Sequence, residues 1–349
     1  MAGVDVGELL LVARRWDRRS DHTSVERFLD YFPGAATLTT ADLWQRPDRL
    51  LHLAAAAARQ DGYTIWGVEF EIRAVLRSLS PKRRPRIVHF LYGDHDFHFS
   101  ARSLRALGVR SVATMFFSVE EMERRMPRKG HLAGLDLVLA TGSEQMEHLA
   151  QFVDRDRLAL LPLGVDTDWF SPGAPDQRVP GRLLQVGANR RDLSTLLAAY
   201  DLLSTEIDGL TIQFVGCDPA TAVFGGRSGV TVSDHLSDEE LRAAYREAEV
   251  VVLPLLEGGS SNALNEALAC GVPVVATDRP NLADYADDSC LTRVPPGDPG
   301  AFAAACRGFL VEPETRAAAA LAARDHALTL DWGVVRGRLL EQYAVLLDR

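Results

Sequence analysis

The sequence contains little that is typical of a secreted or membrane-spanning protein. Only four of its 349 residues are cysteines, and Cys217, Cys270, Cys290 and Cys306 lack the close pairing of a zinc site. We interpret them as buried free thiols in a reducing compartment. The longest apolar runs, such as residues 250–256, are far shorter than the ~20 residues of a membrane span. No signal-peptide pattern is recognisable, so we expect a cytoplasmic protein.

An excess of basic residues is also missing. Lys and Arg number 38 against 48 Asp and Glu, a formal net charge of −10, which argues against a general nucleic-acid binder. The negative net charge does not exclude an anionic ligand that binds in one basic pocket. Two basic runs, Arg14–Arg19 and Pro81–Arg86, fit either solvated loops or peripheral contact with an anionic membrane or an acidic acceptor.

What the chain does contain is an alternation of short apolar strands and helices, which predicts parallel sheets covered by helices. Its length corresponds to two domains at ~100 to 200 residues each. In the first half we expect strands in "ELLLVA", "YTIWGVE", "RIVHFLY", "SVATMFF" and "LDLVLAT", and helices in "LLHLAAAAARQ", "FSARSLRALG" and "EQMEHLAQF".

The second half repeats this alternation. Its expected strands are "RLLQVGA", "LTIQFVG", "VTVSD", "VVVLPLL" and "PVVAT", and its expected helices are "LSTLLAAYDLL", "SDEELRAAYREA" and "ALNEALAC". The Pro- and Gly-rich segment 168–181 between the halves is typical of a linker, and residues 331–349 have the spacing of an amphipathic helix. Two open α/β domains joined in this way are expected to face a cleft, with ligands at the carboxyl ends of the strands.

One helix start is unusually open. In "LEGGSSNALNEALACGVPVVATD", Ser260 or Ser261 can cap a helix from Asn262 to Cys270. A glycine-rich approach to a helix N-terminus lets a phosphate come close to the backbone amides. Glu266 lies roughly 6 to 7 Å further along the axis at ~1.5 Å per residue, a distance that suits a ribose beside a bound diphosphate. A surface helix with a flexible lead-in is the alternative.

Several stretches, in the same order, resemble the retaining nucleotide-sugar glycosyltransferases of family 4, which have the GT-B fold. They are "LLPLGVDTDWFSP", "RLLQVGANRRDLSTLLAAYDLL", "VSDHLSDEELRAAYREAEVVVLPLLEGGSSNALNEALACGVPVVATD" and "VPPGDPGAFAAA". The resemblance implies an α/β protein of two Rossmann-like, doubly wound parallel-sheet domains facing a cleft. The acceptor domain would span residues 1–172 and the donor domain residues 173–330. Residues 331–349 would form a helix that crosses back to the first domain.

The resemblance also implies a set of donor-binding residues. Glu266 matches the glutamate that holds the ribose hydroxyls, and a carboxylate suits a vicinal diol because it accepts two hydrogen bonds. The family's other glutamate aligns with Gly258, so that Glu257, one residue earlier, is the candidate for the sugar.

The diphosphate would be held by two segments of the donor domain. Gly187, Arg190 and Arg191 lie between a strand and a helix, and a guanidinium donates two parallel hydrogen bonds to phosphate oxygens. Arg191 is the preferred candidate because it precedes the helix as "RD". The backbone amides of Ser260, Ser261 and Asn262 would complete the diphosphate site.

The first domain contributes two more candidate segments. His22, Thr23 and Ser24 occupy the position of a family loop that approaches the donor phosphates, although Thr23 or Ser24 could simply cap a helix. A family histidine that faces the reacting sugar aligns with Phe116, whose ring cannot replace an imidazole in hydrogen bonding. His95 or His98 substitutes for it, or the acceptor is held differently, or catalysis is absent.

We therefore expect an enzyme that moves a sugar from a nucleotide-diphosphate donor to an acceptor hydroxyl with retention of anomeric configuration, without a cofactor or metal. The acceptor class is open between a saccharide, a lipid-linked saccharide and a natural product. Two alternatives remain. One is a non-catalytic GT-B protein that binds a nucleotide or a partner, and the other is a nucleotide-sugar epimerase.

Overall fold

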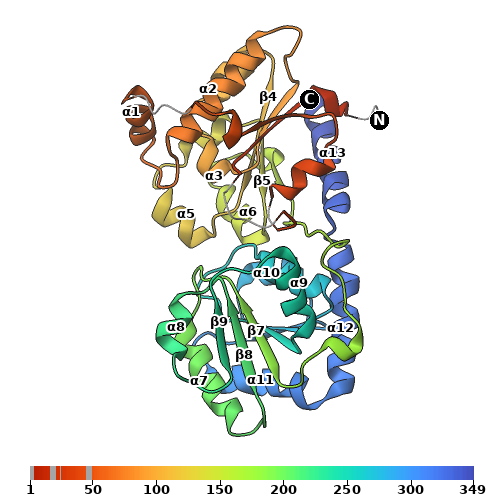
Figure 1. Cartoon of the computed structure of the whole chain (residues 1–349). Helices are drawn as coiled ribbons and strands as arrows, with labels where there is room; N and C mark the ends of the chain where they lie inside the picture. Colours follow the sequence, from red (N-terminus) through yellow and green to blue (C-terminus); the bar gives the residue numbers. More distant parts are fainter. Residues whose placement is uncertain (1–3, 16–20, 24, 45–48) are drawn as a thin grey trace. The chain divides into compact units, whose positions relative to one another are not determined.

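The computed structural model describes residues 4–15, 21–23, 25–44 and 49–349. By its internal contacts the chain forms two compact units. Within the described residues, the first unit contains 4–15, 25–163 and 333–349, and the second contains 21–23 and 164–332. Each unit is built on its own six-stranded sheet (Figure 1).

The first unit has a parallel sheet in the order β2-β1-β3-β4-β5-β6. Its strands are β1 (Leu9–Ala13), β2 (Ala36–Thr39), β3 (Ile87–Phe90), β4 (Arg110–Met115), β5 (Leu137–Ala140) and β6 (Leu158–Leu160). Its helices are α1 (Arg49–Ala58), α2 (Ile65–Leu79), α3 (Gly93–Asp96), α4 (Ala101–Ala106), α5 (Val119–Arg125), α6 (Ser143–Leu149) and α13 (Trp332–Asp348). β1, β3 and β5 are buried along their whole length, as expected for parallel strands covered on both faces.

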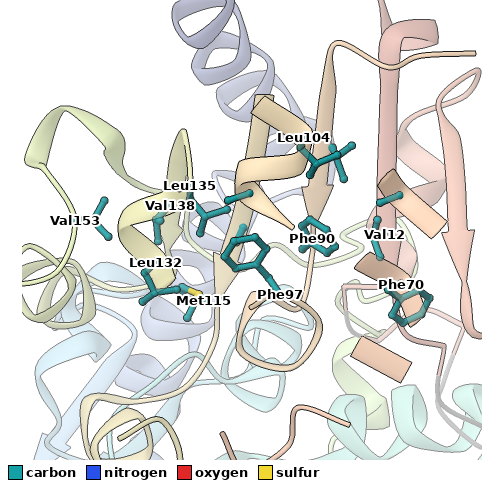
Figure 2. Packing of buried hydrophobic residues seen from close by; sticks show 14 of the residues in the cluster. Val12, Phe70, Phe90, Phe97, Leu104, Met115, Leu132, Leu135, Val138 and Val153 are labelled. Atoms are coloured by element: carbon teal, nitrogen blue, oxygen red, sulfur yellow. The ribbon is translucent and has the colours of Figure 1, made fainter. Parts of the chain in front are cut away.

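The core of the first unit is continuous across the sheet. Figure 2 shows part of this cluster, from Val153 at one end to Phe70 at the other, with Phe90 and Phe97 in contact in the middle. The terminal helix α13 packs on this unit, where the Tyr343 hydroxyl is hydrogen-bonded to His89 Nδ1 at 2.6 Å.

The second unit has a parallel sheet in the order β12-β11-β10-β7-β8-β9. Its strands are β7 (Arg182–Val186), β8 (Thr211–Val215), β9 (Val230–Ser233), β10 (Val250–Leu253), β11 (Val274–Thr277) and β12 (Leu291–Val294). Its helices are α7 (Leu193–Ser204), α8 (Pro219–Phe224), α9 (Asp238–Glu247), α10 (Asn262–Ala269), α11 (Pro299–Val311) and α12 (Pro313–Leu328). Helices α7 and α11 pack together, as do α10 and α12.

The strand order of the second unit creates a topological switch point. From the central β7 the chain runs outward to β8 and β9 on one side, and then crosses to β10, β11 and β12 on the other. The loops that follow β7 and β10 therefore leave the sheet in opposite directions, and this is where open parallel sheets bind ligands.

One predicted strand is wrong. The segment "YTIWGVE" is the start of helix α2, which Thr64 caps by accepting a hydrogen bond from the Trp66 amide at 3.3 Å. Phe70, Ala74 and Ser78 are fully buried, and their spacing of four residues is that of a helix, which the short apolar run had concealed.

The predictions on the cysteines, membrane spans and basic runs can also be compared with the structure. The four cysteines are free and buried, as predicted. No helix in the described ranges has the length and apolar character needed to span a bilayer. Of the two basic runs, Arg14 is buried against Asp96, residues 82–84 and 86 are exposed, and residues 16–19 lie outside the described part of the chain.

Gly164 and Trp332 hold the two ends of the second unit's chain together. The Val165 amide donates to the Leu330 carbonyl at 3.0 Å, and the Trp332 amide donates to the Val165 carbonyl at 3.1 Å. A Cβ on Gly164 would lie 2.3 Å from a ring carbon of Trp332. The absence of a side chain at residue 164 therefore lets the indole pack against the backbone.

We predict that Gly164→Ala lowers the free energy of unfolding by about 1–3 kcal/mol, the usual cost of overpacking a well-packed site. Urea denaturation of the full chain measures this change. Gly308→Ala is the matched control, because nothing lies within 4 Å of its added Cβ and alanine favours a helix interior by up to about 1 kcal/mol. Equal stability of the two variants would contradict the packing argument.

Candidate functional site

The start of α10 is an open, capped helix N-terminus, as predicted. Ser261 is the N-cap, and its hydroxyl accepts a hydrogen bond from the Leu264 amide at 3.3 Å. Gly259 adopts φ +115°, a conformation that favours glycine. Ser260, Ser261 and Asn262 are half-buried, so the backbone amides of the first helical turn lie near the surface of the second unit.

Glu266 lies one turn inside α10 and is almost completely buried. Its Oε2 accepts a hydrogen bond from the Tyr245 hydroxyl of α9 at 2.8 Å. Burial raises the pKa of Glu266 to about 7, against the opposing effect of hydrogen bonds from Tyr245 and Thr23. Near neutral pH this carboxyl group is therefore balanced between its protonated and ionised forms.

The loop between β7 and α7 contains the predicted basic residues. Gly187 has φ +84° and Arg190 has φ +53°, so the backbone turns sharply. Arg191 folds back on the loop, donating from Nη1 to the Asn189 carbonyl at 2.9 Å and from Nη2 to the Val186 carbonyl at 3.2 Å. Its Nε has no hydrogen-bond partner among the described residues. Burial lowers the pKa of Arg191, opposed by Cys217 and Tyr245 nearby.

This loop is tied to the loop that follows β10. Arg190 forms an ion pair with Glu257, whose side chain is 8% exposed against 45% for the arginine. The Leu256 amide donates to the Arg190 carbonyl at 2.9 Å, and the Asp192 amide donates to the Pro254 carbonyl at 2.7 Å. The two segments predicted to bind the donor are thus joined across the switch point.

Two residues of this region were missed by the sequence predictions. Tyr245 looks like an ordinary apolar-face residue of an amphipathic helix, and no sequence signal distinguishes it. Gln185 is fully buried in β7 and donates from Nε2 to the carbonyls of Val186, at 3.0 Å, and Gly187, at 2.6 Å. A lone amide within the apolar run "LLQV" is a signal that could have drawn attention to it.

The predicted first-domain loop belongs by its contacts to the second unit. His22 donates from Nδ1 to Asp166 Oδ2 at 2.8 Å and stacks on the Trp169 ring at 3.8 Å between centroids. Thr23 is hydrogen-bonded to Glu266. Ser24 lies outside the described residues.

His95 and His98 lie in the first unit, in and just after α3. His95 donates from Nδ1 to the Gly62 carbonyl at 3.1 Å, which leaves Nε2 as its hydrogen-bond acceptor. Burial, with help from Arg14, lowers the pKa of His95 to about 4, so this ring is neutral near pH 7. His98 donates from Nδ1 to Gln60 Oε1 at 3.2 Å and stacks on His131 at 4.1 Å.

Phe116 lies beside this histidine segment. Its amide and that of Phe117 donate to Asp94 Oδ2, and its ring is 5.5 Å from that of Tyr92. Burial raises the pKa of Asp94 to about 7. Asp94 therefore fixes the backbone at Phe116, and the aromatic side chain contributes packing at the position where the family carries a histidine.

The predicted residues form two groups of different chemistry. In the second unit, Arg191, the start of α10 and Glu266 combine positive charge with a carboxyl group that can accept hydrogen bonds from a diol. In the first unit, His95 supplies a neutral imidazole. In the described ranges, no three His, Cys, Asp or Glu side chains are grouped so that they could hold a metal ion.

Residues 179–312 match the protein-family model described as "Glycosyl transferases group 1". Among curated proteins, the chain is 30% identical over 202 residues to the MMP alpha-(1->4)-mannosyltransferase of Mycolicibacterium hassiacum, covering 54% of this chain and 47% of that protein. It is 27% identical over 279 residues to the D-inositol 3-phosphate glycosyltransferase of Xylanimonas cellulosilytica, covering 72% and 65%. The chain thus spans about half to two thirds of these relatives.

Solved structures with the same fold cover nearly the whole chain. The sucrose-phosphate synthase of Thermosynechococcus elongatus matches with a TM-score of 0.70 at 20% identity, covering 98% of this chain and 92% of that one. Anabaena HepE, solved in complex with UDP, matches with a TM-score of 0.71 at 11% identity, covering 97% and 99%. The predicted resemblance to family 4 glycosyltransferases and the GT-B fold with two Rossmann-like domains are confirmed.

The raised pKa of Glu266 predicts a specific pH dependence of stability. Between the ordinary value of 4.5 and about 7, the folded chain holds a proton that the unfolded chain releases. This group therefore stabilises the fold less as pH rises through that window. Glu266→Gln, which cannot ionise, removes the effect. The variant should gain about 2.5 kcal/mol relative to the wild type between pH 5 and pH 8.

Urea unfolding of both proteins at the two pH values measures this gain. Glu239→Gln, at an exposed position on α9, is the control and should show no such change. A constant difference between Glu266→Gln and the wild type from pH 5 to pH 8 would show that Glu266 is not buried as described.

Proposed function

We propose that this chain, whose residues 179–312 match the model of the group 1 glycosyl transferases, transfers a glycosyl group from a nucleotide-diphosphate sugar to an acceptor hydroxyl. The observation that carries the proposal is the grouping of Arg191, the α10 N-terminus and Glu266 in the matched segment. Arg191 Nε has no hydrogen-bond partner among the described residues, so this buried guanidinium retains a donor for a ligand.

In this proposal the second unit stabilises the leaving group. The bond between the anomeric carbon and the diphosphate oxygen breaks, and negative charge develops on the diphosphate. Arg191 and the amides of Ser260, Ser261 and Asn262 offer positive charge and preorganised donors at that oxygen, supported by the helix dipole. This fixed charge makes a metal ion unnecessary for neutralising the diphosphate.

Glu266 would accept hydrogen bonds from the ribose hydroxyls. Its pKa of about 7 means that ligand binding, by favouring the ionised form, releases a proton from part of the population near neutral pH. Tyr245 keeps one carboxylate oxygen oriented at 2.8 Å. Glu257, paired with Arg190, would contact the transferred sugar, and Gly187 would let the loop approach the diphosphate.

We further propose that transfer proceeds with retention of anomeric configuration, in the cytoplasm. The new bond forms on the face from which the diphosphate departs, and the acceptor proton passes to the departing phosphate oxygen. The acceptor is a saccharide, a lipid-linked saccharide or a natural product. The relatives named as a mannosyltransferase and as a D-inositol 3-phosphate glycosyltransferase favour a hydroxyl-rich acceptor.

We predict that the chain binds at least one of UDP, GDP, ADP and dTDP, and that Glu266→Ala and Arg191→Met each weaken this binding at least about tenfold, or roughly 1.4 kcal/mol. Isothermal titration calorimetry on the full chain measures the dissociation constants. Arg227→Met is the control for loss of a cation, because Arg227 pairs with Asp201 on an exposed surface of the same unit.

If none of the four nucleotides binds, the donor-site assignment fails. If Glu266→Ala and Arg191→Met bind like the Arg227→Met control, a nucleotide site exists elsewhere in the molecule.

A second candidate function is a non-catalytic nucleotide-binding protein, favoured by Phe116 at the family's histidine position. His95 separates the two possibilities, because its neutral imidazole is the available replacement. If the chain is a transferase that uses His95, His95→Ala should lower kcat for hydrolysis of the matching nucleotide sugar at least about tenfold, with nucleotide affinity unchanged. His52→Ala, exposed on α1, is the control. Binding without any turnover in the wild type would favour the non-catalytic function.

A further inference from the structure

Gln185 is a polar residue in an apolar layer. It lies in the centre of the second sheet, paired in register with Phe214 of β8, and is fully buried. Leu183, two residues earlier on the same face of β7, belongs to the main hydrophobic cluster of this unit together with Phe214. A hydrophobic side chain of similar volume would fill this position without burying an amide.

The Gln185 amide contacts the turn that begins the β7–α7 loop. Its Nε2 donates to the carbonyls of Val186, at 3.0 Å, and Gly187, at 2.6 Å. Both partners are acceptors, so only the NH2 group can face them. The Oε1 atom has no hydrogen-bond partner in the part of the chain that the structure describes. The hydrogen bonds of this amide are therefore those that its NH2 group donates to the loop.

These two bonds determine where the loop's own amides point. In a trans peptide the carbonyl and the following N–H point in opposite directions. The Gly187 N–H donates to the Val215 carbonyl at 2.9 Å. Because Gln185 turns the Gly187 carbonyl toward the interior, the Ala188 N–H on the other side of that peptide points away from it. Ala188 is exposed.

The same amide also supports the guanidinium of the loop. The Val186 carbonyl accepts from Gln185 Nε2 and from Arg191 Nη2, the latter at 3.2 Å. Gln185 therefore helps to fix the orientation of the Val186 carbonyl, which is a hydrogen-bond acceptor of Arg191.

We propose that Gln185 is a positioning residue for the diphosphate: from inside the sheet it orients the Ala188 amide and Arg191 toward an anion of this class. The inference rests on the proposed donor site and adds a buried residue that itself touches no ligand. It predicts that loss of the amide weakens recognition of the phosphates while recognition of the nucleoside is retained.

The test compares Gln185→Met with the wild type, using the nucleoside diphosphate among UDP, GDP, ADP and dTDP that the wild type binds most tightly, and its nucleoside. We expect the dissociation constant of the diphosphate to rise about tenfold, the scale of one or two lost charge-assisted contacts. The dissociation constant of the nucleoside should change less than about twofold. The melting temperature should change little, because Gln185→Met removes an unpaired buried acceptor but also removes the donor of the Gly187 carbonyl.

Leu183→Ala is the matched control, since it alters the same face of the same strand away from the loop. It should lower the melting temperature and leave the ratio of the two dissociation constants unchanged. If Gln185→Met does not fold, Gln185→Asn takes its place, because its amide is too short to reach both carbonyls.

The outcomes separate this inference from the proposed function. If the wild type binds a diphosphate and the Gln185 variant binds it equally well, or loses nucleoside and diphosphate affinity in parallel, the positioning role is overturned and the donor site stands. If the wild type binds none of the four diphosphates, the proposed function fails, and the inference fails with it.

Discussion

The candidate site depends on the tie between the loops that follow β7 and β10. These strands are neighbours at the switch point of the second sheet, so their loops diverge and leave polar backbone that neighbouring strands cannot satisfy. The Arg190 and Asp192 backbone bonds to Leu256 and Pro254, with the Arg190–Glu257 ion pair, close this gap. These contacts hold the loop of Arg191 against the loop that leads into α10.

Burial sets the chemistry of both units. The carboxyl groups of Glu266, Asp94 and Asp96 each have a pKa raised to about 7, with burial as the largest cause. Transfer of a carboxylate from water into a protein interior favours its neutral form unless enough donors face it. Glu266 has few such donors, so its charge is available to respond to a ligand. At Asp96 the Arg14 guanidinium, at 2.5 Å, opposes the effect of burial on the pKa and ties the end of β1 to α3.

The sequence predicted much of the second unit. Strand β7, the capped start of α10 and Glu266 one turn inside it were all recognised from local pattern, because capping and strand burial depend on nearby residues. The N-terminus of α2 was mistaken for a strand, since an apolar window of seven residues is too short to distinguish the helical period of 3.6 residues from the strand period of two. Strands β2, β6 and β12 were not predicted, because short strands at or near sheet edges bury few side chains and carry a weak alternation.

By itself the sequence determined the fold class and the family resemblance, and it supplied the candidate residues for a nucleotide-diphosphate site. It did not determine that Tyr245 lies on Glu266, that Thr23 clusters with the second unit, or that Gln185 supports the Gly187 turn. Those contacts join residues that are distant in sequence or that point into the interior. Tertiary packing alone sets their distances and burial, and hence the pKa of Glu266 and the direction of the loop amides.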